Sequence, residues 1–231
     1  MEKTGHSDRR KDARSKVFVP VVRGRGWSPP SEKQAMFDHI AGHGCFHFKP
    51  GDEPRLALLQ RRLGGIRGLR VLEPGCGSGP LTEWLARWVE PGGHVEAFDP
   101  SAGMLAQAAA NLRGVTNVRL SRRRCEEADW PPASFDIVLC FRVFPHFDDV
   151  EAVLARFHRW LAPEGRLLIV HWEGRQALNA LHAHHGPVDQ DVFPQRSYLE
   201  SALRRRRFKI ERWIEDENEI YVEATRQDTS A

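Results

Sequence analysis

Three glycines separated by single residues follow a short apolar segment, and their spacing limits the chemistry that the turn can do. The stretch Val71–Gly79 reads VLEPGCGSG and places the glycines at Gly75, Gly77 and Gly79. Glycine lets the backbone turn sharply into a following helix and approach a ligand closely. Pro80 stands where a GxGxxG dinucleotide fingerprint needs its third glycine, and no Gly-Lys-Ser/Thr follows to make a phosphate-binding loop. The spacing therefore leaves a GxGxG turn.

Two acidic residues accompany this turn. Glu73 immediately precedes it, and Asp99 follows about twenty residues later, at the end of a predicted strand, His94–Phe98. A carboxylate in that position can accept hydrogen bonds from both hydroxyls of a ribose. Both acids have a local alternative: Glu73 could cap the turn, and Asp99 could cap the helix that begins at Ala102, although Ser101 can serve there.

Four stretches occur in the order and spacing of one family's motifs. They are VLEPGCGSG (Val71–Gly79), VEAFDPSAGML (Val95–Leu105), SFDIVLC (Ser134–Cys140) and LAPEGRLLIV (Leu161–Val170). Together they resemble the class I methyltransferases that depend on S-adenosylmethionine (SAM). The resemblance extends from about residue 31 to residue 225. It implies SAM as the cofactor, with the turn against the methionine moiety, Glu73 near the ammonium group and Asp99 on the ribose.

The resemblance also implies a wider cofactor site. Arg124–Pro131 occupies the place of the adenine-binding segment, but the match is loose, and either Glu126 or the backbone of Cys125 could bind adenine. Trp130 could cover the adenine or belong to the core. Phe141 and Phe144 could stabilise the sulfonium by cation–π contact. The expected cofactor-binding residues are Glu73, Gly75, Cys76, Gly77, Gly79, Asp99, Pro100, Met104, Cys125, Glu126 and Phe141.

Polar residues near the ends of later strands are candidates for the acceptor side. The FPHF stretch around His146 resembles a UbiE-like subgroup of methyltransferases, which also carries residues matching His171, His182 and Asp191. His146 and His171 are the candidate catalytic bases, and the four side chains could instead hold a divalent metal. In the alternative reading, His146 only orders its loop and His182–His185 is a solvated helix end. The metal question stays open.

Composition predicts one globular unit. The chain has 231 residues, 41% of them hydrophobic and 28% charged, with a net charge of +3. That charge is small for a nucleic-acid-binding protein, although arginines cluster at Arg122–Arg124 and Arg204–Arg207. No apolar run reaches the roughly 18 residues of a membrane span, and the charged N-terminus lacks a signal peptide's apolar region. Four cysteines without CxxC spacing predict reduced thiols and a cytoplasmic location.

Strand and helix patterns alternate along the chain, which predicts an α/β fold with helices on both faces of a mostly parallel sheet. By analogy with the family, we expect a Rossmann-like sheet of seven strands in the order 3-2-1-4-5-7-6. Residues 1–30 are expected to be a disordered basic leader and 31–231 a single domain. Within it, 31–66 should form a helical lid, 67–172 the SAM-binding core, and 173–231 the acceptor-side helices and a C-terminal hairpin.

The sequence favours a methyltransferase that acts on a small-molecule acceptor by in-line displacement. An RNA or protein methyltransferase is one alternative, and a SAM-binding regulatory protein without turnover is another. The acceptor, the oligomeric state and the pathway are not determined by the sequence.

Overall fold

A mixed β-sheet forms the centre of the protein in the computed structural model, which describes residues 21–23, 31–43, 47–183 and 185–228. Its strands are β1 (Val21–Arg23), β2 (Arg70–Pro74), β3 (His94–Asp99), β4 (Val118–Arg122), β5 (Phe135–Phe141), β6 (Leu161–His171), β7 (Phe208–Glu215) and β8 (Ile220–Arg226). They lie in the order β1-β4-β3-β2-β5-β6-β8-β7. The strand β8 runs antiparallel to both of its neighbours, β6 and β7, whereas the other described pairs are parallel. From β4 to β7 this is the predicted order 3-2-1-4-5-7-6, which is confirmed.

Two differences from the predicted strands stand out. The strand β1 pairs in parallel with β4 at the sheet edge and adds an eighth strand within the range predicted to be a leader; the rest of residues 1–30 lies outside the described residues. The strand β6 begins at Leu161 and so includes the start of the LAPEGRLLIV stretch, which already pairs with β5 through Phe135. The C-terminal hairpin of β7 and β8 forms as predicted.

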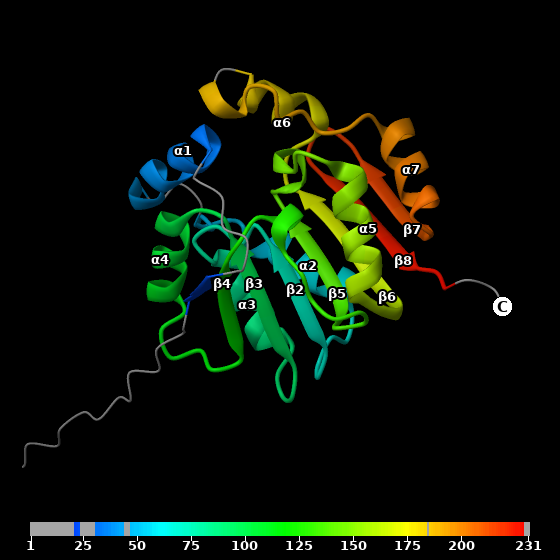
Figure 1. Cartoon of the computed structure of the whole chain (residues 1–231), viewed down its shortest axis with the longest axis horizontal. Coiled ribbons are helices and arrows are strands. Elements are labelled where there is room, and N and C mark those ends of the chain that lie inside the picture. The colour runs from blue at the N-terminus through cyan, green and yellow to red at the C-terminus, as the bar shows by residue number, and fades with distance from the viewer. Residues whose placement is uncertain (1–20, 24–30, 44–46, 184, 229–231) are drawn as a thin grey trace, which may run out of the picture.

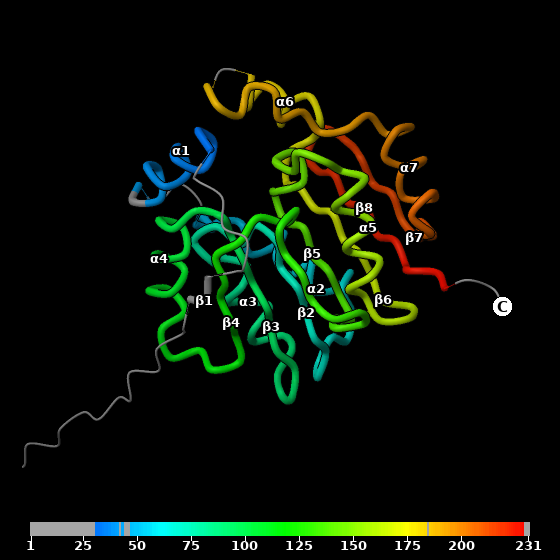
Figure 2. Tube along the Cα trace, in the orientation of Figure 1, coloured from blue at the N-terminus to red at the C-terminus, as the bar shows by residue number. Residues whose placement is uncertain are grey.

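Helices cover both faces of the sheet (Figure 1). They are α1 (Glu32–Ile40), α2 (Glu53–Leu63), α3 (Pro80–Trp88), α4 (Ala102–Asn111), α5 (Val150–Trp160), α6 (Arg175–His182) and α7 (Arg196–Arg205), with 3-10 turns η1 (Ala41–His43), η2 (Cys125–Glu127), η3 (Phe144–His146) and η4 (Gly186–Val188). One apolar cluster joins α2, α3 and α4 to one face, and a second joins α5 and α7 to the other. The trace in Figure 2 passes from α4 and β4 at one side to α7 and β7 at the other.

The two N-terminal helices have different positions, although the sequence predicts both as a lid. Ser31 begins α1 with a capping box, in which its hydroxyl accepts from the Gln34 amide nitrogen and the Gln34 side chain accepts from the Ser31 nitrogen. Figure 1 shows α1 above the edge of the sheet, near α6. By contrast, α2 buries Leu56, Leu59 and Leu63 in the core. The lid prediction is therefore wrong for α2, whose apolar stripe packs on the sheet.

The order of the strands creates a crevice. The strand β2 pairs with β3 on one side and with β5 on the other. The chain continues from β2 through β3 and β4 on one side, and then crosses β2 to form the other side of the sheet from β5 onward. In open α/β sheets, ligands bind at the carboxyl ends of the strands at such a switch point. The glycine turn follows β2, Asp99 ends β3, and Phe141 ends β5, so the fold brings these three features to the same crevice.

Two further findings concern membranes and thiols. Among the described residues, no helix has the length and apolar character needed to cross a bilayer. Cys76, Cys125 and Cys140 are free and buried thiols, whereas Cys45 lies outside the described residues. Burial raises the pKa of each of these three thiols well above its usual value, so they are neutral and poorly nucleophilic at physiological pH.

Candidate active site

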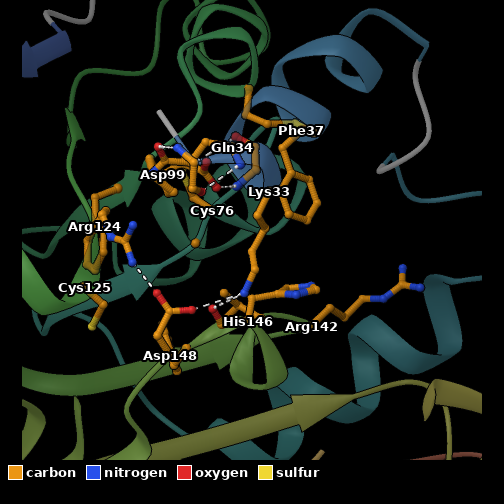
Figure 3. Close-up of a pocket in the computed structure, with 18 of the residues that line it drawn as sticks. Lys33, Gln34, Phe37, Cys76, Asp99, Arg124, Cys125, Arg142, His146 and Asp148 are labelled. Atoms are coloured by element: carbon orange, nitrogen blue, oxygen red, sulfur yellow. Dashed lines mark hydrogen bonds and ion pairs between the residues drawn. The ribbon is translucent and has the colours of Figure 1, made fainter. Parts of the chain in front are cut away.

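A cavity of about 450 Å³ opens at the switch point, between the ends of β2, β3 and β5 and the helix α1 (Figure 3). Its volume lies in the range of about 300–1,000 Å³ that is usual for small-molecule sites. The residues lining it are Ser31, Glu32, Lys33, Gln34, Phe37, Gly75, Cys76, Gly77, Pro80, Phe98, Asp99, Pro100, Met104, Arg124, Cys125, Glu126, Phe141, Arg142, Val143, His146, Phe147, Asp148 and Pro187. All the predicted cofactor residues except Glu73 and Gly79 belong to this set.

The glycine turn needs glycine for two separate reasons. Gly75 has a φ of +66°, and a side chain there would collide with Val143, so this position requires both a left-handed backbone and close packing. Gly79 has a φ of +79° at the start of α3, where an added Cβ would press against Ala108 and Leu112. Gly79 therefore shapes the turn from behind, while Gly75 and Gly77 face the cavity.

Asp99 fastens the glycine turn to the end of β3. Its Oδ2 accepts a hydrogen bond from the Gly77 amide at 2.9 Å, and its Oδ1 accepts one from the Ser101 amide at 2.9 Å. Burial raises the pKa of Asp99 to about 6, although these two backbone donors oppose the rise. Each carboxylate oxygen keeps a second acceptor position, because it offers two lone pairs. The capping alternative does not apply, since the Ser101 hydroxyl caps α4 by accepting from the Met104 amide.

Glu73 lies beneath the cavity and is not part of its lining. It is 2% exposed, and its Oε2 accepts a hydrogen bond from the Thr82 hydroxyl at 2.6 Å. Burial raises the pKa of Glu73 to about 8, since only the Thr82 hydroxyl compensates for lost hydration and Asp99 repels the charge. The structure therefore agrees better with the local alternative, in which Glu73 ties the end of β2 to the first turn of α3.

Of the aromatic side chains suggested for the cofactor, Phe144 belongs to the core and the partly buried Trp130 packs against it. Trp130 does not line the cavity; its ring lies 5.4 Å from Phe98 and 4.9 Å from Trp160, measured between centroids. Phe144 is fully buried and contacts Phe193. Phe141 does line the cavity, with its ring supported by Phe48 and Trp172.

On the acceptor side, His146 and Asp191 form a hydrogen-bonded pair. His146 Nδ1 lies 2.6 Å from Asp191 Oδ2, and the imidazole lines the cavity. The His182 ring lies 5.0 Å from that of His146, and its Nδ1 is 2.5 Å from the Asp191 carbonyl oxygen. Burial lowers the pKa of His182, which favours its neutral form. Because a carboxylate only accepts, the pair keeps the proton of His146 on Nδ1 and leaves Nε2 as the basic nitrogen.

The second catalytic candidate, His171, is not at the cavity. Its side chain is completely buried at the end of β6, against the ring of Phe193. Neither ring nitrogen has a hydrogen-bond partner among the described residues. Burial lowers the pKa of His171 well below its usual value, so the imidazole is neutral. The side chain is also not part of the cavity lining. The prediction of a catalytic His171 is therefore not supported by its position.

The metal hypothesis finds no cluster in the described part of the chain. No group of three or more His, Cys, Asp or Glu side chains there has an arrangement that could hold an ion. His146 and His182 already direct their Nδ1 atoms to Asp191, and His171 lies apart in the core.

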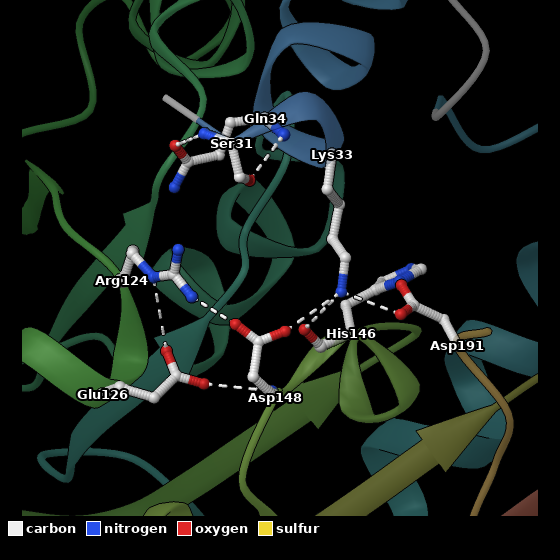
Figure 4. A network of polar contacts seen from close by, with 8 residues as sticks. All are labelled: Ser31, Lys33, Gln34, Arg124, Glu126, His146, Asp148 and Asp191. Carbon is white, nitrogen blue, oxygen red and sulfur yellow. Dashed lines mark hydrogen bonds and ion pairs between the residues drawn. The ribbon is translucent and has the colours of Figure 1, made fainter. Parts of the chain in front are cut away.

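Sequence reasoning missed several cavity residues, among them Lys33. Its Nζ lies 2.8 Å from Asp191 Oδ1, 3.3 Å from Asp148 Oδ1 and 3.3 Å from the His146 carbonyl oxygen. Arg124 reaches the other oxygen of Asp148 (Figure 4). A single lysine on a polar helix has no sequence signature, and only the position of α1 over the sheet reveals its partners.

Comparison with known proteins identifies the domain that carries this cavity. Residues 71–165, from β2 into β6, match a family model described as a methyltransferase domain. Residues 71–165 therefore carry a methyltransferase domain. The glycine turn, Asp99 and the strand β5 of this methyltransferase domain all lie inside the matched range.

Curated relatives of the methyltransferase domain include several O-methyltransferases. A ubiquinone biosynthesis O-methyltransferase of Bradyrhizobium diazoefficiens is 39% identical over 146 residues, covering 62% of this chain and 55% of the relative. A nocamycin O-methyltransferase of Saccharothrix syringae is 34% identical over 142 residues, covering 57% and 48%. The chain thus spans about half the length of the curated relatives that it matches.

Solved structures share the fold of the methyltransferase domain at low sequence identity. A SAM-dependent methyltransferase from Aquifex aeolicus is 20% identical with a TM-score of 0.61, covering 77% of this chain and 98% of that one. A phosphoethanolamine N-methyltransferase from Haemonchus contortus, solved with SAM, is 18% identical with a TM-score of 0.64, covering 84% and 57%.

Proposed function

We propose that this protein transfers the methyl group of SAM to an oxygen atom of a small-molecule acceptor. One observation carries the proposal: a single cavity is lined both by the glycine turn with Asp99 and by His146, which is paired with Asp191. The first group suits a nucleoside cofactor, and the second suits removal of a proton. The names of the curated relatives, which are O-methyltransferases, support an oxygen acceptor.

The residues present fit SAM on physical grounds. Gly75 and Gly77 leave the cavity wall free of side chains, and the Asp99 carboxylate at that wall can accept the ribose hydroxyls. When bound, SAM supplies a methyl carbon attached to a positively charged sulfur. Phe141 presents an aromatic ring at the end of β5, and a ring face attracts a cation. Pro100, Met104, Cys125 and Glu126 would enclose the nucleoside.

His146 would act as the general base. A hydroxyl acceptor must lose its proton as its oxygen attacks, and a positioned imidazole accelerates such a step by about 10²–10⁴-fold. Through its hydrogen bond to Nδ1, Asp191 would orient the ring and stabilise the imidazolium that forms. Nε2 of His146 would take the proton of the acceptor hydroxyl, and SAM, when bound, would supply the methyl group.

The position of α1 favours a small acceptor over a polymer. Lys33, Gln34 and Phe37 from this helix line the cavity, and Lys33 Nζ lies within hydrogen-bond distance of Asp191, the partner of the cavity residue His146. A strand of RNA or a protein segment would have to displace that contact. Any RNA association should therefore be weak and only slightly dependent on salt, whereas a true RNA substrate would give a steep dependence.

Two measurements test the proposal. Thermal shift with SAM, S-adenosylhomocysteine and NADH should show stabilisation by the first two alone, because mass action raises the unfolding temperature only for a ligand of the native state. A metabolite extract incubated with methyl-labelled SAM should then yield a labelled small molecule with a new methoxy group. Binding without any labelled product would favour a regulatory protein, and label in RNA or protein would replace the small-molecule acceptor.

A further inference from the structure

Lys33 joins the helix α1 to the residues expected to do the acid–base chemistry. Its side chain descends from α1 toward His146 and Asp191 (Figures 3 and 4). The shortest of its ionic contacts is to Asp191 Oδ1 at 2.8 Å, with Asp148 at 3.3 Å. The Lys33 side chain is 21% exposed and that of Asp191 is 10% exposed, so water screens this pair only in part.

The carboxylate of Asp191 is shared between two cations or potential cations. One oxygen accepts from His146 Nδ1 and the other from Lys33 Nζ. Burial by itself would raise the pKa of Asp191, but the hydrogen bonds from His146 and Lys33 outweigh it and hold that pKa below the usual value. Asp191 is therefore an anion, and its effect on His146 depends on how much of its charge Lys33 offsets.

The charged and titratable groups around His146 come from several elements. They are Lys33 on α1, Asp99 at the end of β3, Asp148 after η3, His171 at the end of β6, His182 on α6 and Asp191 after η4. The three carboxylates favour a protonated imidazole. Lys33 is the cation that contacts both Asp191 and Asp148, so it opposes two of these three anions directly.

We infer that Lys33 is a positioning residue for the proposed base: it holds Asp191 in place against His146 and offsets part of the negative charge that Asp191 places beside the imidazole. This inference rests on the proposed function. Without the ammonium group, Asp191 would still orient His146 but would also stabilise the imidazolium before reaction, which reduces the fraction of enzyme with a free base.

Hydrogen bonds connect the helix α1, which carries Lys33, to the cofactor side of the cavity. Asp38 on α1 accepts hydrogen bonds from the Ser101 hydroxyl at 2.5 Å and from the Gly103 amide at 2.8 Å. The amide of Ser101 in turn donates to Asp99. The segment expected to hold the ribose thus also anchors the helix that carries Lys33. The contact between Lys33 and Asp191 therefore depends on the position of α1.

The test is an NMR titration of the His146 imidazole in the folded protein without acceptor, with its signals assigned from His146→Gln. In Lys33→Met, which keeps the length of the side chain but not its charge, the titration midpoint of His146 should rise by about 0.5–1 pH unit. Lys33→Arg should restore most of the original midpoint. Lys49→Met, which removes the same charge from an exposed residue outside the cavity lining, should leave it unchanged. An unchanged or lower midpoint in Lys33→Met, in a protein that still melts cooperatively, overturns the inference.

Kinetics supply the second readout once an acceptor is known. The acidic limb of the kcat–pH profile of Lys33→Met should move to higher pH by the same amount, with the KM for SAM unchanged. A loss of rate that is equal at every pH would instead mark Lys33 as merely structural and contradict the inference. Because the titration needs no turnover, a failed methyl-transfer assay with a shifted midpoint would reject the proposed function while leaving the charge relation intact.

Discussion

The two halves of the cavity are assembled in different ways. The cofactor half is made from neighbouring strand ends and their turns, with Gly77 and Asp99 joined by a backbone hydrogen bond. The acceptor half is made from side chains of three distant segments, Lys33, His146 and Asp191, joined by charged contacts. A site fixed by backbone geometry should tolerate few changes of shape, whereas a site fixed by charges should respond to changes of charge and pH. Substitutions in each half of the cavity distinguish these two behaviours.

The largest effect is expected in the acceptor half, on rate. His146→Ala should lower kcat by about 10²–10⁴-fold, because a positioned general base contributes that much. Its Kd for SAM should stay within about twofold, since the cofactor half does not depend on this side chain. His94→Ala is a matched control, as this exposed residue begins β3 at the opposite end of that strand from Asp99. An unchanged kcat in His146→Ala would remove the base from the mechanism.

Replacement of one glycine should break the cofactor half by shape alone. Gly75→Ala places a methyl group against Val143 at a positive φ, and overpacking together with left-handed strain should cost about 3 kcal/mol in the free energy of unfolding. Gly114→Ala has a φ of +88° without any atom within 4 Å of the added Cβ, so it isolates the strain and should cost only about 1 kcal/mol. Urea denaturation measures both. Equal losses of stability in the two variants would show that the close approach of Val143 to Gly75 is unimportant. Adding Val143→Ala to Gly75→Ala should restore part of the lost stability, because it removes the clash.

Asp99→Ala should weaken SAM binding by about 100-fold, measured by isothermal titration calorimetry, because two hydrogen bonds from the ribose to a carboxylate are lost. Asp129→Ala removes an exposed carboxylate that pairs only with Arg159 at the surface, and it should leave affinity unchanged. Similar Kd values for Asp99→Ala and the wild type would mean that the ribose binds elsewhere.

The smallest effect concerns pH. Glu73 has a pKa of about 8 in the folded protein, above its ordinary value near 4.5, so the folded state binds the extra proton. Stability from this group is complete below pH 4.5 and is lost as the pH rises toward 8. The free energy of unfolding of the protein without cofactor should therefore fall, relative to that of Glu73→Gln, as the pH rises from 5 to 8. A difference that does not vary with pH would mean that Glu73 is already ionised in the folded state.

The sequence predicted the fold, and most of the residues expected to bind the cofactor line one cavity, for a physical reason. Alternating strand and helix patterns determine a doubly wound sheet, and the glycine turn and Asp99 belong to one strand–helix–strand unit, β2–α3–β3, whose geometry is general. Ser101 was recognisable as a cap because capping is a local interaction.

The acceptor half was predictable only in part. His146 and Asp191 were identified as candidates, but Lys33 was not, because its partners lie more than a hundred residues away along the chain. His171 and Glu73 were wrongly expected at the cavity. Each lies at the end of a strand that is buried on both faces, where apolar residues do not alternate, and so the sequence cannot tell which face a side chain takes.

The central claim is that the cavity between the glycine turn and α1 holds the adenosyl cofactor. A crystal structure of the protein with S-adenosylhomocysteine tests it most directly. We predict density for the nucleoside inside the cavity, with both ribose hydroxyls donating to the Asp99 carboxylate and with His146 facing the open position beside the sulfur atom. Density on another surface of the molecule, or a cavity that stays empty at saturating ligand, would contradict the account.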